Sequence, residues 1–160
     1  MLCNLTLIGK WQSNELKKKV KTLLLNNKDS KKIIFKKYIP NNMLPMEYQK
    51  ADLVVLNLQW DEPCPKTLYE SLACGTPVLV TDKAAVAKEL INNNISGIIV
   101  PVNRFESTLC NLVYKPEIIR KMKYKEINKI SEEYSFESVY KKLKVFFNIS
   151  NKREKKNENY

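Results

Sequence analysis

The feature that most constrains the fold is an alternation of short apolar runs with stretches of helical periodicity. Runs that are apolar along their whole length indicate strands buried on both faces, and helical connections of this length join parallel strands. The sequence therefore predicts an α/β fold, a Rossmann-like parallel sheet with helices on both faces. The predicted strands are residues 2–8, 32–36, 52–56, 77–81 and 97–100. The predicted helices are 13–25, a short helix within 40–50, 66–74, 84–91, 105–113, 116–134 and 136–147.

The length and composition suit one folded domain. The chain has 160 residues, of which 44% are hydrophobic, and no window offers the roughly 18 consecutive apolar residues of a membrane span. Its first residues lack the basic region and cleavage site of a signal peptide, so we expect a cytoplasmic protein. We expect residues 2–148 to form the domain and the charged residues 149–160 to form a disordered tail.

The absence of histidine excludes several kinds of chemistry. No histidine is present to complete a zinc site with the scattered cysteines, and Ser-His or Cys-His nucleophiles are equally excluded. Any chemistry must therefore use carboxylates, backbone amides, lysines or hydroxyls. The cysteines are expected to be reduced thiols, buried or half-buried: Cys3, Cys64, Cys74 and Cys110.

The formal charge of +11 suggests an anionic partner. Nucleic acid, a membrane surface or a phosphorylated substrate would each fit. However, lysine runs such as residues 17–19 fall on the solvent face of a predicted helix, and we favour a solvated surface. No nucleic-acid partner is expected, because that interpretation rests on charge alone and lacks aromatic stacking motifs.

A phosphate-binding site is predicted at the start of the helix at residues 66–74. Pro65 suits the first helical position, because the N–H that proline lacks would have no partner there. The backbone amides of Lys66, Thr67 and Leu68 would then point out of the helix, beside the positive end of its dipole. Such a helix start can bind a phosphate or a diphosphate.

Two glutamates, eight positions apart, flank this helix start. Glu62 lies in the loop ahead of it, within reach of a group attached beyond the phosphate. Glu70 is predicted at the rim of the site, where its carboxylate could accept two hydrogen bonds from a vicinal diol such as a ribose. The spacing alone leaves another interpretation open, in which Glu70 is a solvated residue paired with Lys66.

The order of the motifs around these glutamates resembles the donor-binding C-terminal half of retaining glycosyltransferases of the GT-B fold, the group 1 or family-4 class. Members commonly read AD before an apolar strand, then W-x-E-P-F-G, a second glutamate after seven residues, and A-x-G-x-P-V. The resemblance covers about residues 2–148. This chain reads AD at 51–52, WDEPCP at 60–65, ESLACGTPV at 70–78 and NISGIIVPV at 94–102, with the most specific part at 62–77.

The resemblance implies a role for each site residue and a nucleotide-sugar donor. Glu62 would be the catalytic residue that bonds hydroxyls of the donor sugar, and Glu70 would bond the ribose of the nucleotide. No metal ion or other cofactor is implied, because the helix start and basic side chains neutralise the leaving diphosphate. The remaining donor-binding residues are Lys66, Thr67 and Leu68 at the diphosphate, Tyr38 and Ile39 at the base, and Cys64, Gly9 and Lys10.

In the family, an acceptor-binding domain and a further strand precede the region that this chain matches. The chain is therefore expected to be truncated at its N-terminus, with the first central strand of the sheet missing. That strand would lie between the strands at 2–8 and 52–56. Three arrangements follow: these two strands pair directly, a partner chain fills the gap between them, or the protein is a remnant of a longer enzyme. Pro65 also departs from the family pattern, which usually has glycine there.

The implied function is a glycosyltransferase donor domain that serves transfer to a glycan or a lipid-linked acceptor. We expect the isolated chain to be inactive, with a partner chain supplying the acceptor domain. Lys10 and Lys66 would stand in only partly for the basic pair that grips the diphosphate in the family. The basic surface would suit peripheral contact with the inner face of a membrane. The alternative is a non-catalytic fragment or interaction module that retains the fold.

Overall fold

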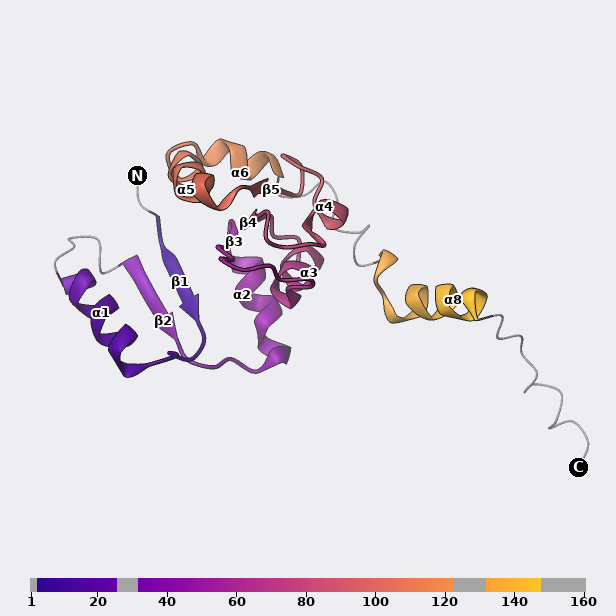
Figure 1. Ribbon diagram of the computed structural model, residues 1–160, viewed down its shortest axis with the longest axis horizontal. Helices are drawn as coiled ribbons and strands as arrows, with labels where there is room; N and C mark the ends of the chain where they lie inside the picture. The colour runs from indigo at the N-terminus through magenta and orange to yellow at the C-terminus, as the bar shows by residue number, and fades with distance from the viewer. Residues whose placement is uncertain (1–2, 26–31, 123–131, 148–160) are drawn as a thin grey trace, which may run out of the picture.

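The structure is a computed structural model that describes residues 3–25, 32–122 and 132–147 (Figure 1). Strands and helices alternate up to residue 100, the described elements after it are helical, and the predicted α/β fold is confirmed. The predicted tail at 149–160, and part of the helix predicted at 116–134, lie outside the described residues. The elements are β1 (Leu5–Ile8), α1 (Asn14–Leu25), β2 (Ile33–Lys36), a 3-10 turn (Asn41–Met43), α2 (Leu44–Lys50), β3 (Val54–Leu56), α3 (Lys66–Ala73), β4 (Val78–Thr81), α4 (Ala87–Leu90), β5 (Gly97–Val100), a 3-10 turn (Val102–Arg104), α5 (Phe105–Tyr114), α6 (Pro116–Met122) and α8 (Phe136–Phe146).

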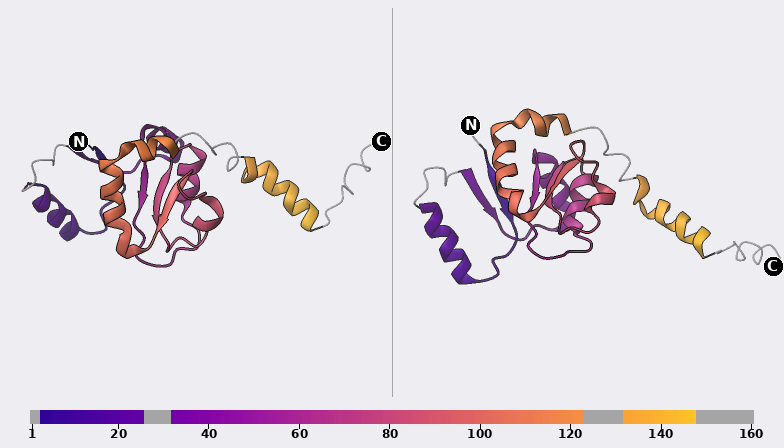
Figure 2. Two further views of the ribbon diagram at one scale, coloured as in Figure 1. Left: turned by 90° about the horizontal axis from the view of Figure 1, so that it is seen from above. Right: turned by 45° about the horizontal axis from the view of Figure 1, so that its top comes forward.

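The strands form two parallel sheets, whereas the sequence predicts one. β1 pairs with β2 in the first sheet, and β3, β4 and β5 follow one another in the second. In Figures 1 and 2, β1 lies on the side of β2 that faces the three-stranded sheet, and α8 projects away from both sheets. Direct pairing of β1 with β3, one of the expected arrangements, is wrong, because no hydrogen-bonded ladder joins them in the described part of the chain.

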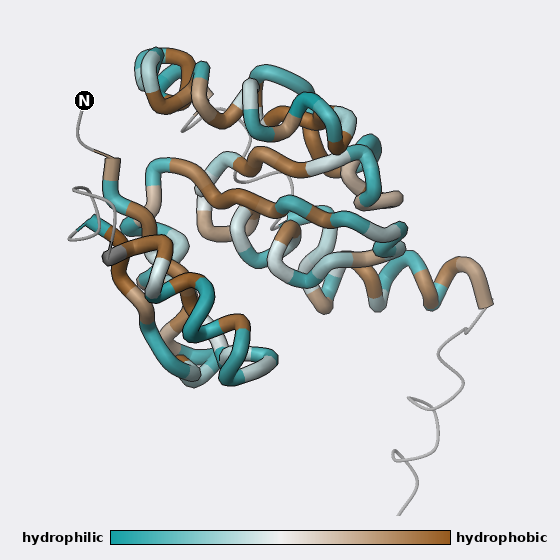
Figure 3. Tube along the Cα trace, turned by 60° about the vertical axis from the view of Figure 1, so that its left-hand side comes forward, coloured by the Kyte–Doolittle hydropathy of each residue, from teal (hydrophilic) through white to brown (hydrophobic). Residues whose placement is uncertain are grey.

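The core of the molecule surrounds β4, the central strand of the three-stranded sheet. Val78 and Val80 point to one face, where they pack with buried residues of α3 and α4. Leu79 points to the opposite face, where it packs with residues of α5 and α6. Figure 1 shows these helices on opposite sides of the sheet, and Figure 3 shows hydrophobic segments of the chain enclosed between them. The prediction of a strand buried on both faces is confirmed for β4.

The two-stranded sheet leaves apolar side chains partly in water. All four residues of β1 are exposed, so the prediction of a buried strand is wrong for this segment. A parallel strand is buried when helices cover both faces of its sheet, whereas β1 has only β2 as a strand neighbour among the described residues. The rings of Trp11 and Phe35 lie 5.0 Å apart. The exposed apolar side chains of this region are Leu5, Leu7, Ile8, Leu16, Leu23, Ile34 and Phe35.

Several local expectations can be compared directly with the structure. Ser13 caps α1 as the sequence indicates, because its hydroxyl accepts the N–H of Leu16 at 3.0 Å. The helix predicted at 84–91 is shorter, since α4 begins at Ala87 and the preceding turn bonds to the loop that carries Glu62. The prediction of buried or half-buried cysteines holds for Cys74 and is wrong for the other three, which are exposed: Cys3, Cys64 and Cys110.

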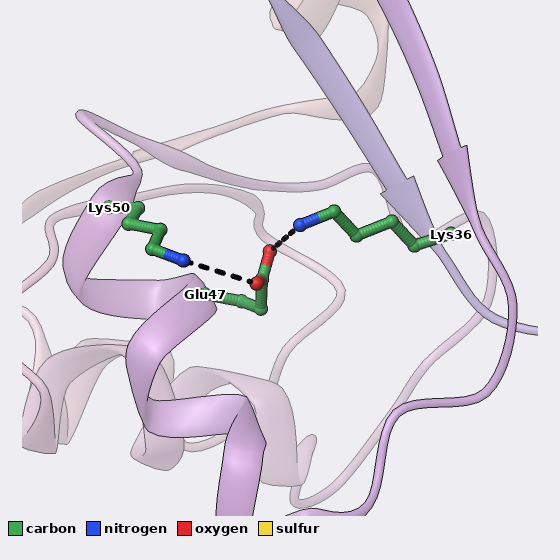
Figure 4. A network of polar contacts seen from close by, with 3 residues as sticks. All are labelled: Lys36, Glu47 and Lys50. Atoms are coloured by element: carbon green, nitrogen blue, oxygen red, sulfur yellow. Dashed lines mark hydrogen bonds and ion pairs between the residues drawn. The ribbon is translucent and has the colours of Figure 1, made fainter.

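An ion pair connects the two-stranded sheet to α2 (Figure 4). Lys36, at the end of β2, lies 2.5 Å from one carboxylate oxygen of Glu47, and Lys50 lies 3.7 Å from the other. The hydrogen bond from Lys36 lowers the pKa of Glu47 below its ordinary value of 4.5; attraction to both lysines adds to this effect, and burial opposes it. Glu47 is therefore a charged link between β2 and the helix that precedes β3.

This link predicts an acid-sensitive contribution to stability. A carboxyl whose pKa is lowered by folding contributes stability that is complete above its unfolded pKa and is lost as the pH falls through its folded pKa. The urea midpoint of the wild type is expected to exceed that of Glu47→Gln near neutral pH, and the difference is expected to shrink as the pH falls below 4.5. Glu106→Gln, at an exposed glutamate of α5, is the matched control. A difference for Glu47→Gln that does not change with pH would contradict the assignment.

Candidate functional site

The start of α3 follows the loop at the carboxyl end of β3. Pro65 is the N-cap residue, with φ of −68° and ψ of 111°, and is not the first helical residue as predicted. Its carbonyl accepts the N–H of Leu68 at 3.0 Å, so the prediction of a free Leu68 amide is wrong. The N–H groups of Lys66 and Thr67, at the first two helical positions, are the donors directed out of the helix start.

Packing and turn geometry hold α3 in place. Leu68 is fully buried and Leu72 is 4% exposed, so this face of the helix is fixed on the sheet. The hydroxyl of Ser71 donates to the carbonyl of Thr76 at 2.8 Å, and Gly75, with φ of 79°, turns the chain toward β4. The start of α3 is therefore carried by a rigid element, as a preorganised binding site requires.

Backbone hydrogen bonds hold Glu62 against the loop that follows β4. Its N–H donates to the carbonyl of Lys83 at 2.8 Å, and its carbonyl accepts the N–H of Ala85 at 3.0 Å. The ammonium group of Lys83 lies 3.0 Å from the carboxylate of Asp61, whose hydrogen bond raises the pKa of that lysine. The loops after β3 and β4 thus meet at the carboxyl edge of the sheet, with the half-buried Glu62 between them.

Glu70 lies on an exposed face of α3, one turn beyond its start. The hydroxyl of Tyr48, from α2, donates to Oε2 of Glu70 at 2.7 Å. Burial raises the pKa of Tyr48, and the hydrogen bond to the Glu70 carboxylate raises it further. Glu70 is exposed as the alternative interpretation expects, but the described residues contain no ion pair between Glu70 and Lys66. Its carboxylate is instead oriented by a neutral phenol.

Cys64 is placed beside a different face of α3. Its thiol lies next to the hydroxyl of Tyr69, and the pKa of Tyr69 is raised to about 12 by burial and by its hydrogen bond with Cys64. The ring of Tyr69 also contacts that of Tyr134 at a centroid distance of 5.4 Å. Cys64 therefore contacts Tyr69 whereas Glu70 contacts Tyr48, although both Cys64 and Glu70 are predicted to be donor-binding residues.

The other predicted donor-binding residues follow the strands of the two-stranded sheet. Gly9 follows β1 with φ of 145°, and its N–H donates to the carbonyl of Lys36 at 3.1 Å. Lys10 is exposed, the Tyr38 side chain is 67% exposed, and Ile39 is half-buried. Within the described ranges, no hydrogen bond or ion pair joins Gly9, Lys10, Tyr38 or Ile39 to Glu62 or Glu70. The predicted donor-binding residues thus fall into two groups, one at each sheet.

The sequence reasoning missed Tyr48, which is the direct partner of Glu70. The two residues are 22 positions apart on different helices, and no sequence spacing relates residues across α2 and α3. The threonine of the Gly-Thr-Pro turn is the sequence feature that relates to this contact. Thr76 is 1% exposed, and its hydroxyl donates to the carbonyl of Tyr48 at 2.6 Å. A buried hydroxyl needs such a partner, and this one lies on α2.

Solved structures share this architecture. Anabaena HepE in complex with UDP superposes with a TM-score of 0.75 at 14% sequence identity, over 92% of this chain and 41% of that chain. Sucrose-phosphate synthase from Thermosynechococcus elongatus gives a TM-score of 0.70 at 18% identity, over 91% of this chain and 38% of that chain. The fold is accordingly one half of a GT-B fold, with parallel sheets flanked by helices.

Comparison with sequence relatives and with family models identifies the family. The Bacillus subtilis (strain 168) protein YtcC is 26% identical over 147 residues, which are 87% of this chain and 35% of that protein. The chain therefore spans about a third of the length of this relative. The family model described as "Glycosyl transferases group 1" matches residues 3–125. Because that match covers most of the chain, including the loop of Glu62 and all of α3, the chain belongs to the glycosyl transferases group 1 family.

Proposed function

We propose that this chain is a donor-binding domain that holds a nucleotide diphosphate sugar for transfer of its glycosyl group. The observation that carries the proposal is the arrangement around α3, where Glu62 lies before the helix start and Glu70 is oriented one turn beyond it. A diphosphate at the amides of Lys66 and Thr67 would lie between the two carboxylates. The sugar would then extend toward Glu62 and the ribose toward Glu70.

Each proposed role follows from the chemistry of the residue. The Glu62 backbone is held at the carboxyl edge of the sheet, which fixes the point from which its carboxylate would reach the sugar hydroxyls. The helix start and the nearby Lys66 would stabilise charge on the departing diphosphate. Tyr38 and Ile39, which follow β2, would contact the base, as the family resemblance implies. The HepE complexes with UDP and UDP-glucose support a nucleotide sugar as the ligand class.

Transfer itself also needs an acceptor held near the sugar. We propose that a glycan or lipid-linked acceptor is presented by a second domain or a partner chain, and that residues 3–147 alone turn over little or no donor. Among the described residues, no helix combines the length and the apolar composition that a membrane span requires. The formal charge of +11 supports peripheral contact with an anionic membrane or an anionic acceptor.

Isothermal titration calorimetry with a panel of UDP-, GDP- and ADP-sugars tests the proposal. One nucleotide class is expected to bind with an affinity in the micromolar to millimolar range, and the sugar-free diphosphate of that class is expected to bind as well. The circular dichroism spectrum and a cooperative unfolding transition serve as the check that the sample is folded. Absence of binding at millimolar donor in a folded sample would reject the proposal for this chain.

A further inference from the structure

We propose that Tyr48 is a positioning residue that orients the Glu70 carboxylate toward a ribose and thereby makes the site selective for ribonucleotides over 2′-deoxyribonucleotides. This inference rests on the proposed function, because it assigns the mechanism by which Glu70 would recognise the nucleotide. The observation behind it is the 2.7 Å hydrogen bond from the Tyr48 hydroxyl to Oε2 of Glu70. Tyr48 touches the site residue, and no part of its role requires contact with the ligand.

Glu70 needs such a partner because its own surroundings leave it free to move. Its side chain is exposed on α3, and a glutamate in this position loses substantial rotamer entropy when it is fixed by a ligand. A hydrogen bond to a charged acceptor is stronger than one between neutral groups, so the phenol can hold one rotamer before the ligand arrives. The Glu70 side chain then loses its rotamer freedom when the protein folds and not when the ligand binds.

Tyr48 is itself anchored by three parts of the fold. Its carbonyl accepts the hydroxyl of Thr76 at 2.6 Å and the N–H of Ala51 at 3.0 Å. Its hydroxyl also interacts with the side chain of Thr67, at the second position of α3. The Tyr48 carbonyl is thus held by the turn before β4 and by the end of α2, and its hydroxyl contacts the first turn of α3. The residue that would position the ribose contact thus also adjoins the predicted diphosphate contact.

The chemistry of a carboxylate explains the selectivity. Glu70 has two oxygens with about four acceptor positions. The phenol occupies one position on Oε2, which leaves Oε1 to accept from the hydroxyls of a diol. The raised pKa of Tyr48 keeps its proton on the phenol oxygen, so it remains a donor at ordinary pH. A 2′-deoxyribose lacks one of the two hydroxyls, and its loss leaves a charged acceptor without that partner.

Tyr48→Phe tests the inference, with UDP, GDP and ADP and their 2′-deoxy counterparts as the probes. The wild type is expected to prefer the ribonucleotide by about tenfold or more, from the loss of one hydrogen bond to a charged group. The variant is expected to bind the ribonucleotide about fivefold more weakly and the deoxynucleotide within about twofold of wild type, so that the preference falls. A purely structural role would weaken both nucleotides equally. Tyr140→Phe, at an exposed tyrosine of α8, is the matched control.

The outcomes separate this inference from the proposed function. An unchanged ribose preference in Tyr48→Phe, or an equal loss for both nucleotides, would overturn the role of Tyr48 while nucleotide binding stands. Absence of binding by the folded wild type would reject the proposed function and this role with it. If Tyr48→Phe does not fold, tyrosine-labelled wild-type protein provides the test: the Tyr48 ring signals are expected to shift with the ribonucleotide, and no shift on saturation would overturn the role.

Discussion

Replacing Glu70 with glutamine is expected to weaken nucleoside diphosphate binding by about tenfold to a hundredfold, since a hydrogen bond to a charged group contributes about 1.5–3 kcal/mol. The substitution keeps the size of the side chain and removes the negative charge that would accept the ribose hydroxyls. Stability is expected to change little, because the side chain is exposed and its hydrogen bond within the described part of the chain is to Tyr48. Calorimetry with the nucleotide and a urea unfolding curve give the two measurements.

Glu106→Gln is the matched control for this prediction. Glu106 is an exposed glutamate in the first turn of α5, a helix that covers the opposite face of the three-stranded sheet. Its substitution removes the same charge and is expected to leave nucleotide affinity within about twofold. If Glu70→Gln binds as tightly as the wild type, or if both variants lose affinity equally, Glu70 is not the ribose contact.

Leu79→Ala is expected to cost about 2–5 kcal/mol of folding free energy, as do other truncations of buried leucines. Leu79 is fully buried in the central strand and packs against Phe105, Leu112 and Ile119 on the face covered by α5 and α6. A loss of this size is a large share of the stability of a domain of this length. The urea midpoint of the variant, compared with that of the wild type, measures it.

Leu7→Ala provides the contrast, because it makes the same chemical change at β1. The Leu7 side chain is 42% exposed, so its truncation removes less buried surface and is expected to cost about 1 kcal/mol or less. The difference between the two variants reports where the core lies. Equal losses would contradict the description of a core confined to the three-stranded sheet and its helices.

The sequence predicts the elements of this fold well and their lateral arrangement less well. Apolar runs and helical periodicity depend on local neighbours, and the order of strands and helices follows from them. Strand pairing depends on contacts between distant segments, and the separation of β1–β2 from β3–β5 could not be read from periodicity.

Packing explains one residue of the sequence motifs, Gly97. A Cβ at this position would lie 2.5 Å from the carbonyl oxygen of Val78, so any other residue there would keep β5 from approaching β4 as closely as it does.

The candidate site shows the same division. The spacing of Glu62 and Glu70 and the proline before α3 indicate a helix start with flanking carboxylates, and the structure has these groups on the loop and helix expected. The partner of Glu70 and the environment of Cys64 depend on side chains from other elements, Tyr48 and Tyr69. The Leu68 amide is unavailable to a ligand because it donates to the Pro65 carbonyl. That bond depends on Pro65 being the N-cap residue and not the first helical residue.

The most direct test of the site's location is a nitrogen-15 nuclear magnetic resonance titration of the folded chain with UDP, GDP or ADP. We expect the amide signals of Lys66 and Thr67 to shift most on saturation, because their N–H groups would bond the diphosphate. Signals of α5 and α6, on the other face of the three-stranded sheet, are expected to stay in place. Shifts confined to α5 and α6, or unchanged Lys66 and Thr67 signals in a saturated sample, would contradict the claim that this domain holds its donor at the start of α3.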